Sequence, residues 1–293
     1  MAHLLAESGK KVLCVDCDSQ CNLTAYCMGA DKIFYSEEGL DRQNTIYQAI
    51  SPFINTMREF KDVEIYEIRE YANGGMVDLI QGDLSLNDFE DNLGRSYLSI
   101  NNALDVCQQI AIYNFLLKMG SDNKYGVDYD FILIDLGPNL GSLNRSVLNA
   151  SDYIITPMSP DMFSIQATEN LGRKMKEWSE EWSDFLKDLD KSKNAILKQS
   201  LANLDVNIEL PKGKPQFLGY IIQKFTMGPA KNPAVAFKNF MNRFEPAFTE
   251  SIIGPLSKYD QIALGIKDFN MGEIPDMATA VPTSMEYNYS LKS

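Results

Sequence analysis

The stretch that most constrains the fold of this chain is residues 129–141, which read YDFILIDLGPNLG. Residues 131–134 form a continuous apolar run without polar alternation, and this pattern predicts a strand that is covered on both faces in a parallel sheet. Ligands of such sheets collect at the carboxyl ends of the strands, and Asp135 stands there. Gly137 and Pro138 predict a sharp turn directly after it. A single acid in this position more often caps the following helix, so the interpretation depends on the rest of the chain.

A second stretch of the same kind covers residues 11–15, where KVLCV predicts another buried strand. Asp16 and Asp18 follow at its carboxyl end, one next to the sheet and one in the loop. Because the carboxyl ends of parallel strands meet at one edge of a sheet, we expect these acids on the same edge as Asp135. Acids placed in this way can hold a water molecule against a phosphate, so a magnesium and water-positioning site is predicted here.

The remaining elements alternate along the chain and indicate an α/β fold. Strands are also predicted over residues 76–81, 153–156 and 217–223, with a further candidate at 249–253. Helices are predicted over residues 2–8, 22–28, 44–50, 85–93 and 100–119, a loop over 31–41, and a long charged helical stretch over 163–204. Pro157 is expected to end the strand at 153–156. This order predicts a doubly wound, mostly parallel sheet with helices on both faces, in a single domain over residues 1–293.

Composition narrows the class of protein. Hydrophobic residues make up 45% of the 293 residues and charged residues 23%, which argues for a sizeable core and against wholesale disorder. The sequence has neither a secretory signal pattern nor an apolar run long enough to span a membrane, so we expect a soluble, cytoplasmic protein. The spacing of Cys14 and Cys17 could suggest zinc or redox chemistry. Because His3 is the only histidine, we expect buried apolar thiols instead, and no histidine base.

Charge is distributed unevenly along the chain. The net charge of −13 argues against a surface coated with nucleic-acid-binding charge. Residues 171–243 nevertheless hold 13 bases and 8 acids, so a local basic face could contact DNA there. The C-terminal residues MEYNYSLKS lack the basic amphipathic helix of a membrane-surface anchor, and we expect no membrane partner.

An aromatic and apolar stripe lies on the long helical stretch. Trp178, Trp182, Phe185 and Leu189 follow one another at helical spacing. We expect this stripe to pack within the domain, and the alternative is a face that binds a partner.

Four segments in the same order resemble the ParA-like partitioning ATPases, the deviant Walker P-loop family that also contains MinD. They read VDCDSQCNLT, LIQGDLSL, YDFILIDLGPNLG and ASDYIITPMSPDMFSIQATENL. Any one of them would be a weak signal, whereas four in the family's order are specific. The resemblance implies a P-loop NTPase-like α/β fold for most of the chain.

The resemblance also implies roles for individual residues. Asp135 matches the Walker B acid, which holds Mg²⁺ through water, and Asp18 matches the acid that orients the attacking water. Asp16 matches the neighbour of Asp18 in switch I. Residues matched to the nucleotide, the dimer interface or the turn that senses the γ-phosphate are Gln20, Asn22, Gly137 and Pro138, with a looser match for Gln223 and Lys224 near the adenine base.

One departure from the family pattern concerns the phosphate-binding loop. The loop K-G-G-x-G-K-[ST] and the strand before it are absent from this sequence, and neither Gly9-Lys10 nor Gly213-Lys214 can replace them. Carboxylates without that loop would repel a nucleotide, so we expect this polypeptide alone neither to bind Mg-ATP tightly nor to hydrolyse it. Either the gene model begins at an internal methionine, or the protein is a degenerate relative. Ser19 also replaces the family's usual proline.

The resemblance therefore implies a ParA-like ATPase of chromosome or plasmid partitioning, or a fragment of one. In its full form it would bind Mg-ATP, form a homodimer, bind DNA non-specifically and respond to a ParB-like partner protein. The alternative is a non-catalytic ParA-like binding or scaffold protein that no longer hydrolyses ATP. Without the first strand of the family, two sheet edges are expected to be unpaired.

Overall fold

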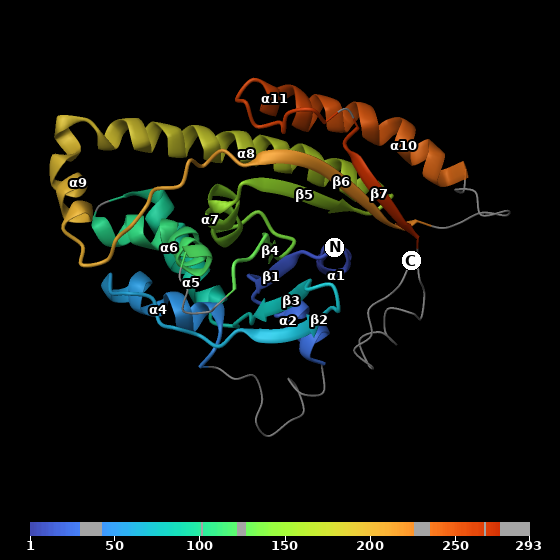
Figure 1. Ribbon diagram of the computed structural model, residues 1–293. Helices are drawn as coiled ribbons and strands as arrows, with labels where there is room; N and C mark the ends of the chain where they lie inside the picture. The colour runs from blue at the N-terminus through green and yellow to red at the C-terminus, as the bar shows by residue number, and fades with distance from the viewer. Residues whose placement is uncertain (30–42, 101, 122–126, 226–234, 267, 276–293) are drawn as a thin grey trace. The chain divides into compact units, whose positions relative to one another are not determined.

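The structure, a computed structural model, describes residues 1–29, 43–100, 102–121, 127–225, 235–266 and 268–275 (Figure 1). The chain divides into two compact units, which are described separately. Of the described residues, the first unit holds 1–147 and 193–210, and the second holds 148–192 and 211–275. The assignment of residues 1–293 to one domain stays a prediction, and the loop predicted at 31–41 lies outside the described residues.

The centre of the first unit is a four-stranded sheet with the strand order β2–β3–β1–β4. In it, β1 (Lys11–Asp16) is parallel both to β3 (Met76–Ile80) and to β4 (Phe131–Asp135). The edge strand β2 (Tyr66–Glu70) is antiparallel to β3. The strands predicted at residues 11, 76 and 131 are confirmed. Sequence reasoning missed β2 because three of its five residues, in YEIRE, are charged.

Helices surround this sheet. They are α1 (Ala2–Glu7), α2 (Asn22–Met28), α4 (Ile46–Thr56), α5 (Leu86–Leu98), α6 (Ala103–Ser121), α7 (Ser142–Ala150) and α9 (Ala195–Ala202). On one face, Val12 and Cys14 share a core with Ala6 of α1 and are packed by Leu23 of α2. The alternate residues of β1 point to the opposite face and are equally buried. Both faces of β1 are therefore covered, as its apolar run predicts.

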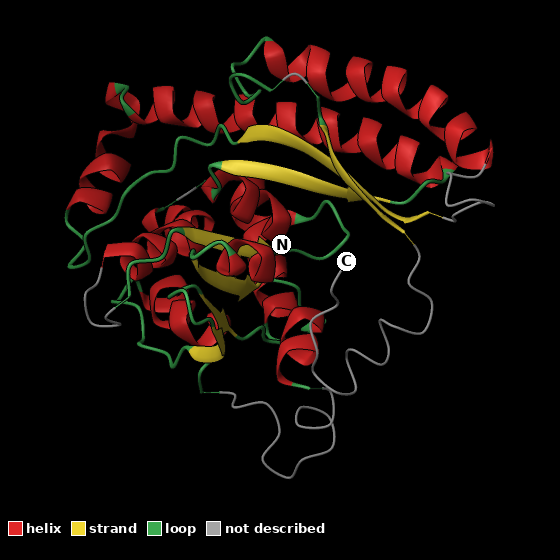
Figure 2. Cartoon of the chain, turned by 45° about the vertical axis from the view of Figure 1, so that its right-hand side comes forward, coloured by secondary structure: helices red, strands yellow, loops and turns green. Residues whose placement is uncertain are grey.

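The second unit contains a three-stranded parallel sheet, ordered β5 (Tyr153–Met158), β6 (Gln216–Phe225) and β7 (Asn270–Pro275). Its helices are α8 (Met162–Leu189), α10 (Val235–Phe248) and α11 (Gly254–Ser257), with a 3-10 turn, η2 (Ser192–Asn194), after α8. Figure 2 shows the long helices (red) running along this sheet (yellow). None of the helices described combines the length and apolar character needed to cross a membrane.

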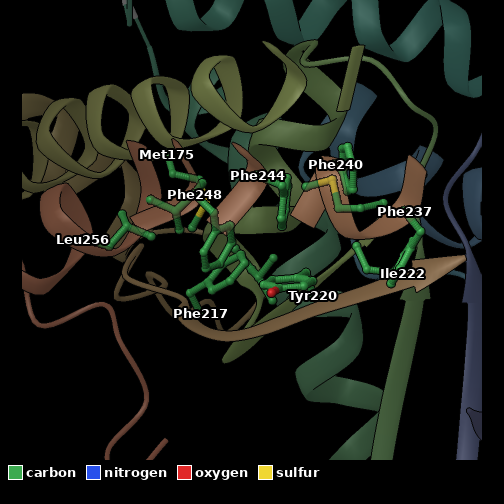
Figure 3. Close-up of a cluster of buried hydrophobic side chains, with 12 residues drawn as sticks. Met175, Phe217, Tyr220, Ile222, Phe237, Phe240, Phe244, Phe248 and Leu256 are labelled. Atoms are coloured by element: carbon green, nitrogen blue, oxygen red, sulfur yellow. The ribbon is translucent and has the colours of Figure 1, made fainter. Parts of the chain in front are cut away.

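Aromatic side chains form the core of the second unit (Figure 3). Tyr220 of β6 contacts Phe244 and Phe248 of α10 edge to face, at ring-centroid distances of 4.9 and 4.8 Å. Phe217 of β6 packs on Phe248 at 5.6 Å. Edge-to-face pairs stabilise a core beyond their buried area, which explains how a three-stranded sheet is held to its covering helices.

Two local predictions for the second unit are wrong. Residues 249–253, a candidate strand, form a π-helical turn (Thr249–Ile253) that joins α10 to α11. The apolar positions Phe244, Phe248 and Ile252 recur every four residues across this junction, so the helical face outweighs the local strand propensity. The other error concerns Pro157, which does not end β5. It lies inside an edge strand, where a residue without an N–H group is tolerated.

The predicted burial of β4 on both faces is also wrong. Among the described residues β4 pairs only with β1, and Phe131 is 42% exposed. In the second unit β5 is likewise an edge strand, and Tyr153 is 58% exposed. An apolar run reports hydrophobicity and not the presence of a neighbouring strand, which is why the sequence pattern overestimated the burial of β4.

The packing interpretation of the tryptophan stripe is confirmed. Trp178 and Trp182 of α8 are buried, and the indole Nε1 of Trp182 donates to the main-chain oxygen of Pro211 at 2.8 Å. Gly213 has a φ of +64°, and a methyl group there would lie 2.1 Å from the Trp182 ring. The stripe is therefore occupied within its own unit and is not a free face for a partner.

Candidate functional site

The parallel pairing of β1 and β4 places the candidate site at the carboxyl ends of these two strands. Asp16 and Asp135 are the last residues of these strands and stand opposite each other in register. The N–H of Cys17 continues the ladder by donating to the Asp135 main-chain oxygen at 2.9 Å. The predicted convergence of the two strand ends at one edge of the sheet is thus present.

Asp16 is fully buried, and its carboxylate is occupied by the protein itself. Its Oδ2 accepts hydrogen bonds from the N–H and the hydroxyl of Thr24, at 2.8 and 2.6 Å, and its Oδ1 accepts from the N–H of Asp18 at 3.1 Å. The Thr24 hydroxyl accepts in turn from the N–H of Gly82 at 2.9 Å. Burial raises the pKa of Asp16, and the hydrogen bonds act in the opposite direction. Asp16 therefore fastens α2 and the loop before it to the end of β1.

Asp18 is oriented by the loop that follows it. Its Oδ1 accepts from the N–H of Gln20 at 3.0 Å, and its Oδ2 accepts from the side-chain Nδ2 of Asn22 at 3.3 Å. Each carboxylate oxygen has two acceptor positions, so each keeps a further one for a water molecule. Cys21, which precedes α2, has a φ of +54°, and its N–H donates to the Asp18 main-chain oxygen. The main-chain N–H of Gln20 and the side chain of Asn22 thus hold the Asp18 carboxylate in place.

Two glycines allow the neighbouring loops to approach these acids. A methyl group on Gly137, after β4, would lie 3.1 Å from Oδ1 of Asp18. A methyl group on Gly82, after β3, would lie 2.9 Å from the carboxyl carbon of Asp16. Sequence reasoning predicted Gly137 and missed Gly82 and Thr24, although both residues lie in segments that carried the family resemblance.

Asp135 is the most exposed of the three acids. Its pKa is raised to about 6, mainly by partial burial of the carboxyl and to a smaller extent by the negative charges of Asp16 and Asp18. The charge crowding that favours a proton on Asp135 at low pH favours a cation next to it at neutral pH.

The donor set fits one kind of metal. Among the described residues, no three or more His, Cys, Asp or Glu side chains are grouped to hold a metal ion. Mg²⁺ does not need such a cage, because it keeps several waters and binds through one or two carboxylates together with substrate phosphates. Asp135, at the strand end and beside two further acids, fits such a carboxylate. The thiols nearby fit zinc poorly, because burial raises the pKa of Cys14 to about 11 and that of Cys21 to about 12.

The other predicted site residues fall into two groups. Gln20, Asn22, Gly137 and Pro138 lie in the first unit, in the loop and helix after β1 and in the loop after β4. Gln223 and Lys224 lie in β6 of the second unit, and the structure does not join them to the acids.

The predicted basic face is partly neutralised. Five basic residues on and just after α8 form ion pairs with acids three or four positions away: Arg173, Lys174, Lys176, Lys187 and Lys191. These residues belong to the 13 bases counted between 171 and 243, so the charge free to contact DNA is smaller than the count suggests.

Comparison with known sequences identifies a family and relatives of this chain. Residues 1–188 match a family model described as an AAA domain. An uncharacterized protein of Methanocaldococcus jannaschii is 28% identical over 169 residues, which is 58% of this chain and 55% of that protein. A putative replication protein A of Rhizobium rhizogenes is 27% identical over 172 residues, 57% of this chain and 37% of that protein. The chain thus spans about half the length, or less, of these curated relatives.

Solved structures show the same fold. Protein DIP2308 from Corynebacterium diphtheriae has a TM-score of 0.67 at 24% identity, covering 98% of this chain and 90% of that one. An ATP complex of McdA from Cyanothece scores 0.57 at 15% identity, with coverages of 98% and 79%. A putative plasmid partition protein from Borrelia burgdorferi B31, bound to AMPPNP, scores 0.54 at 18% identity, with coverages of 100% and 84%. The predicted P-loop NTPase-like fold class is confirmed.

Proposed function

The chain belongs to the AAA-domain family and has a ParA-like P-loop fold, and on that premise we propose that it is a ParA-like ATPase of plasmid or chromosome partitioning, or a part of one. The observation that supports this most is the in-register meeting of Asp16 and Asp135, with Asp18 held in the adjoining loop. ATP-dependent homodimerisation, non-specific DNA binding, a ParB-like partner and a cytoplasmic location belong to the same proposal.

Each of the three acids has its own part in the proposed reaction. Asp16 holds the loop and α2 in place through its internal hydrogen bonds. Asp18, fixed by Gln20 and Asn22, orients a water molecule with its remaining acceptor positions. Asp135 holds a hydrated Mg²⁺, which when bound offsets the negative charge of the phosphates. Gly137 and Pro138 form the turn beside Asp18, and Gln223 and Lys224 are proposed to lie near the adenine base.

We propose that this polypeptide alone, residues 1–293, binds Mg-ATP weakly. The strand ends present three carboxylates, and the sequence contains no K-G-G-x-G-K-[ST] loop to supply cationic side chains and main-chain N–H groups. Titration of this chain with labelled ATP and Mg²⁺ tests the point. We expect no saturation in the micromolar range, and micromolar binding would overturn this part of the proposal.

The DNA upstream of the Met1 codon tests the proposed activity itself. An in-frame phosphate-binding loop, together with Mg-dependent ATP hydrolysis by the product that carries it, is the expected result. A reading frame without the loop and a product without hydrolysis would contradict an ATPase. A stable complex with a partner protein that survives both Asp18→Ala and Asp135→Ala would then support a non-catalytic binding protein.

A further inference from the structure

Helix α7 has a glycine at the position where a capping side chain usually stands. The main-chain oxygen of Gly141 accepts the first helical hydrogen bond, from the N–H of Arg145 at 3.0 Å, so Gly141 is the N-cap residue. The first N–H groups of a helix have no partner within the helix and are usually satisfied by a Ser, Thr, Asp or Asn at this position. Glycine cannot supply such an oxygen.

A carboxylate from another helix occupies the place of the missing cap. Oε1 of Glu90, on α5, accepts from the N–H of Leu143 at 3.4 Å. A methyl group on Gly141 would lie only 1.8 Å from the same oxygen. Glu90 therefore stands where an N-cap side chain would stand, and its negative charge is placed favourably at the helix N-terminus. The absence of a side chain at Gly141 is what leaves room for it.

The capped end of α7 carries the loop that borders the acidic site. The Nδ2 group of Asn144, in the first turn of α7, donates to the main-chain oxygens of Gly137 and Asn139, at 2.7 and 2.5 Å. The side chain of Asn139 in turn accepts from the N–H of Gly141 at 3.0 Å. Gly137 is the residue at which an added methyl group would lie 3.1 Å from Oδ1 of Asp18. The position of the loop over Asp18 thus depends on where α7 begins.

We propose that Glu90 is a positioning residue for the candidate site: it caps α7 from α5 and so holds the loop of residues 137–141 against Asp18. The capping oxygen belongs to Glu90 on α5, whereas the N-cap position that it serves is Gly141, before α7. The inference rests on the contacts of Glu90, and only its consequence for hydrolysis rests on the proposed function.

Hydrogen exchange of the chain without nucleotide tests the proposal, so the result does not depend on whether ATP binds. In Glu90→Ala we expect the amides of residues 139–145 to exchange roughly threefold or more faster, since a long hydrogen bond to the Leu143 N–H and a negative charge at the helix N-terminus are both lost. Glu90→Gln keeps an acceptor oxygen and should restore most of the protection. Asp91→Ala, at the exposed neighbouring position of α5, is the matched control and should leave these amides unchanged.

A double substitution gives a sharper result because it moves the capping oxygen from position 90 on α5 to position 141, at the N-cap of α7 itself. Gly141→Ser alone pushes aside the end of the flexible Glu90 side chain and places a serine at the N-cap, so exchange should change little. Combined with Glu90→Ala, the same serine has space and is itself a good N-cap, so protection should return towards that of the unsubstituted chain. Unchanged exchange in Glu90→Ala, or a double variant whose effects merely add, would overturn the proposal.

Discussion

At the scale of single residues, three aspartates of one site differ in what surrounds them. Asp16 has no exposure and three internal hydrogen-bond donors, whereas Asp135 reaches solvent at the end of an edge strand. Asp18 lies between these extremes, buried but with acceptor positions to spare. An aspartate side chain therefore has a structural role at position 16, whereas at positions 18 and 135 it is available to a ligand.

This difference predicts opposite effects of one substitution on stability. Asn at position 16 keeps only one acceptor oxygen and turns an NH₂ group towards a former donor, so Asp16→Asn should lower the free energy of unfolding by about 1–3 kcal/mol. Asp135→Asn relieves charge crowding and should leave stability unchanged or raise it. Urea denaturation at pH 7 measures both. Equal losses in the two variants would contradict the assignment of an anchoring role to Asp16.

The raised pKa of Asp135, caused by partial burial and by the neighbouring acids, also predicts how stability depends on pH. Its pKa is about 6 in the folded protein against an ordinary value of 3.8, so the folded state binds the proton more tightly than the unfolded state. The free energy of unfolding should therefore fall as pH rises from about 4 to above 6. Denaturation curves across this range should show a smaller decrease in Asp135→Asn. An unaltered pH profile in that variant would count against a raised pKa of Asp135.

The acidic cluster was predictable from sequence, whereas its internal organisation was not. The two apolar runs, each ending in Asp, were enough to place Asp16 and Asp135 at one sheet edge. Which of them is buried depends on Thr24 and on the glycines that let loops close over it, and these contacts join residues up to 58 positions apart. Glu90 carries no local signal at all, because its partner is a helix N-terminus elsewhere in the chain.

At the scale of elements, the contact between α8 and the π-helical turn shows how closely two helices can approach. A methyl group on Gly172 of α8 would lie 2.0 Å from the main-chain oxygen of Ser251. The π-helical turn aims this oxygen at α8, and only a glycine accommodates it. The sequence could not reveal this, because a glycine inside a helical pattern is normally read as a weakness and a π-helical turn has no pattern of its own.

Gly172→Ala should therefore destabilise the protein by about 1–3 kcal/mol, since neither backbone can yield without disturbing the aromatic core. Gly254→Ala is the matched control. Gly254 has ordinary helical dihedral angles, and the nearest atom to an added methyl group lies at 3.4 Å, so alanine should be neutral or slightly stabilising there. Thermal unfolding of both variants measures the difference, and equal melting temperatures would contradict the close contact.

At the scale of the whole molecule, each unit has a sheet with a free edge strand rich in apolar residues. In the described part of the chain β4 ends the first sheet and β5 ends the second, and Phe131 and Tyr153 are exposed on them. The resemblance to a known family anticipated unpaired edges, whereas composition and periodicity predicted strands buried on both faces. Neither source anticipated the division into two compact units.

Free apolar edges predict self-association of this chain. Unpaired N–H and C=O groups beside exposed aromatic side chains are a template for strand pairing between molecules. Sedimentation velocity should show concentration-dependent species larger than a monomer without any nucleotide. Phe131→Lys combined with Tyr153→Lys should reduce them, because charge at an edge opposes pairing. A single monomeric species across the concentration range would contradict this expectation.

The central claim is that the carboxyl ends of β1 and β4 form the acidic half of an Mg-ATP site. Its most direct test is the Mg-dependent ATP turnover of the complete product of the gene that encodes this chain. Asp18→Asn and Asp135→Asn should each lower turnover at least about 100-fold. Asp130→Asn, the same change at the amino end of β4, weakens a surface pair with Lys10 and a hydrogen bond from the main-chain N–H of Lys11, both at the opposite end of the strands from the acids, and should leave turnover unchanged. Full turnover in Asp18→Asn and Asp135→Asn would contradict the claim.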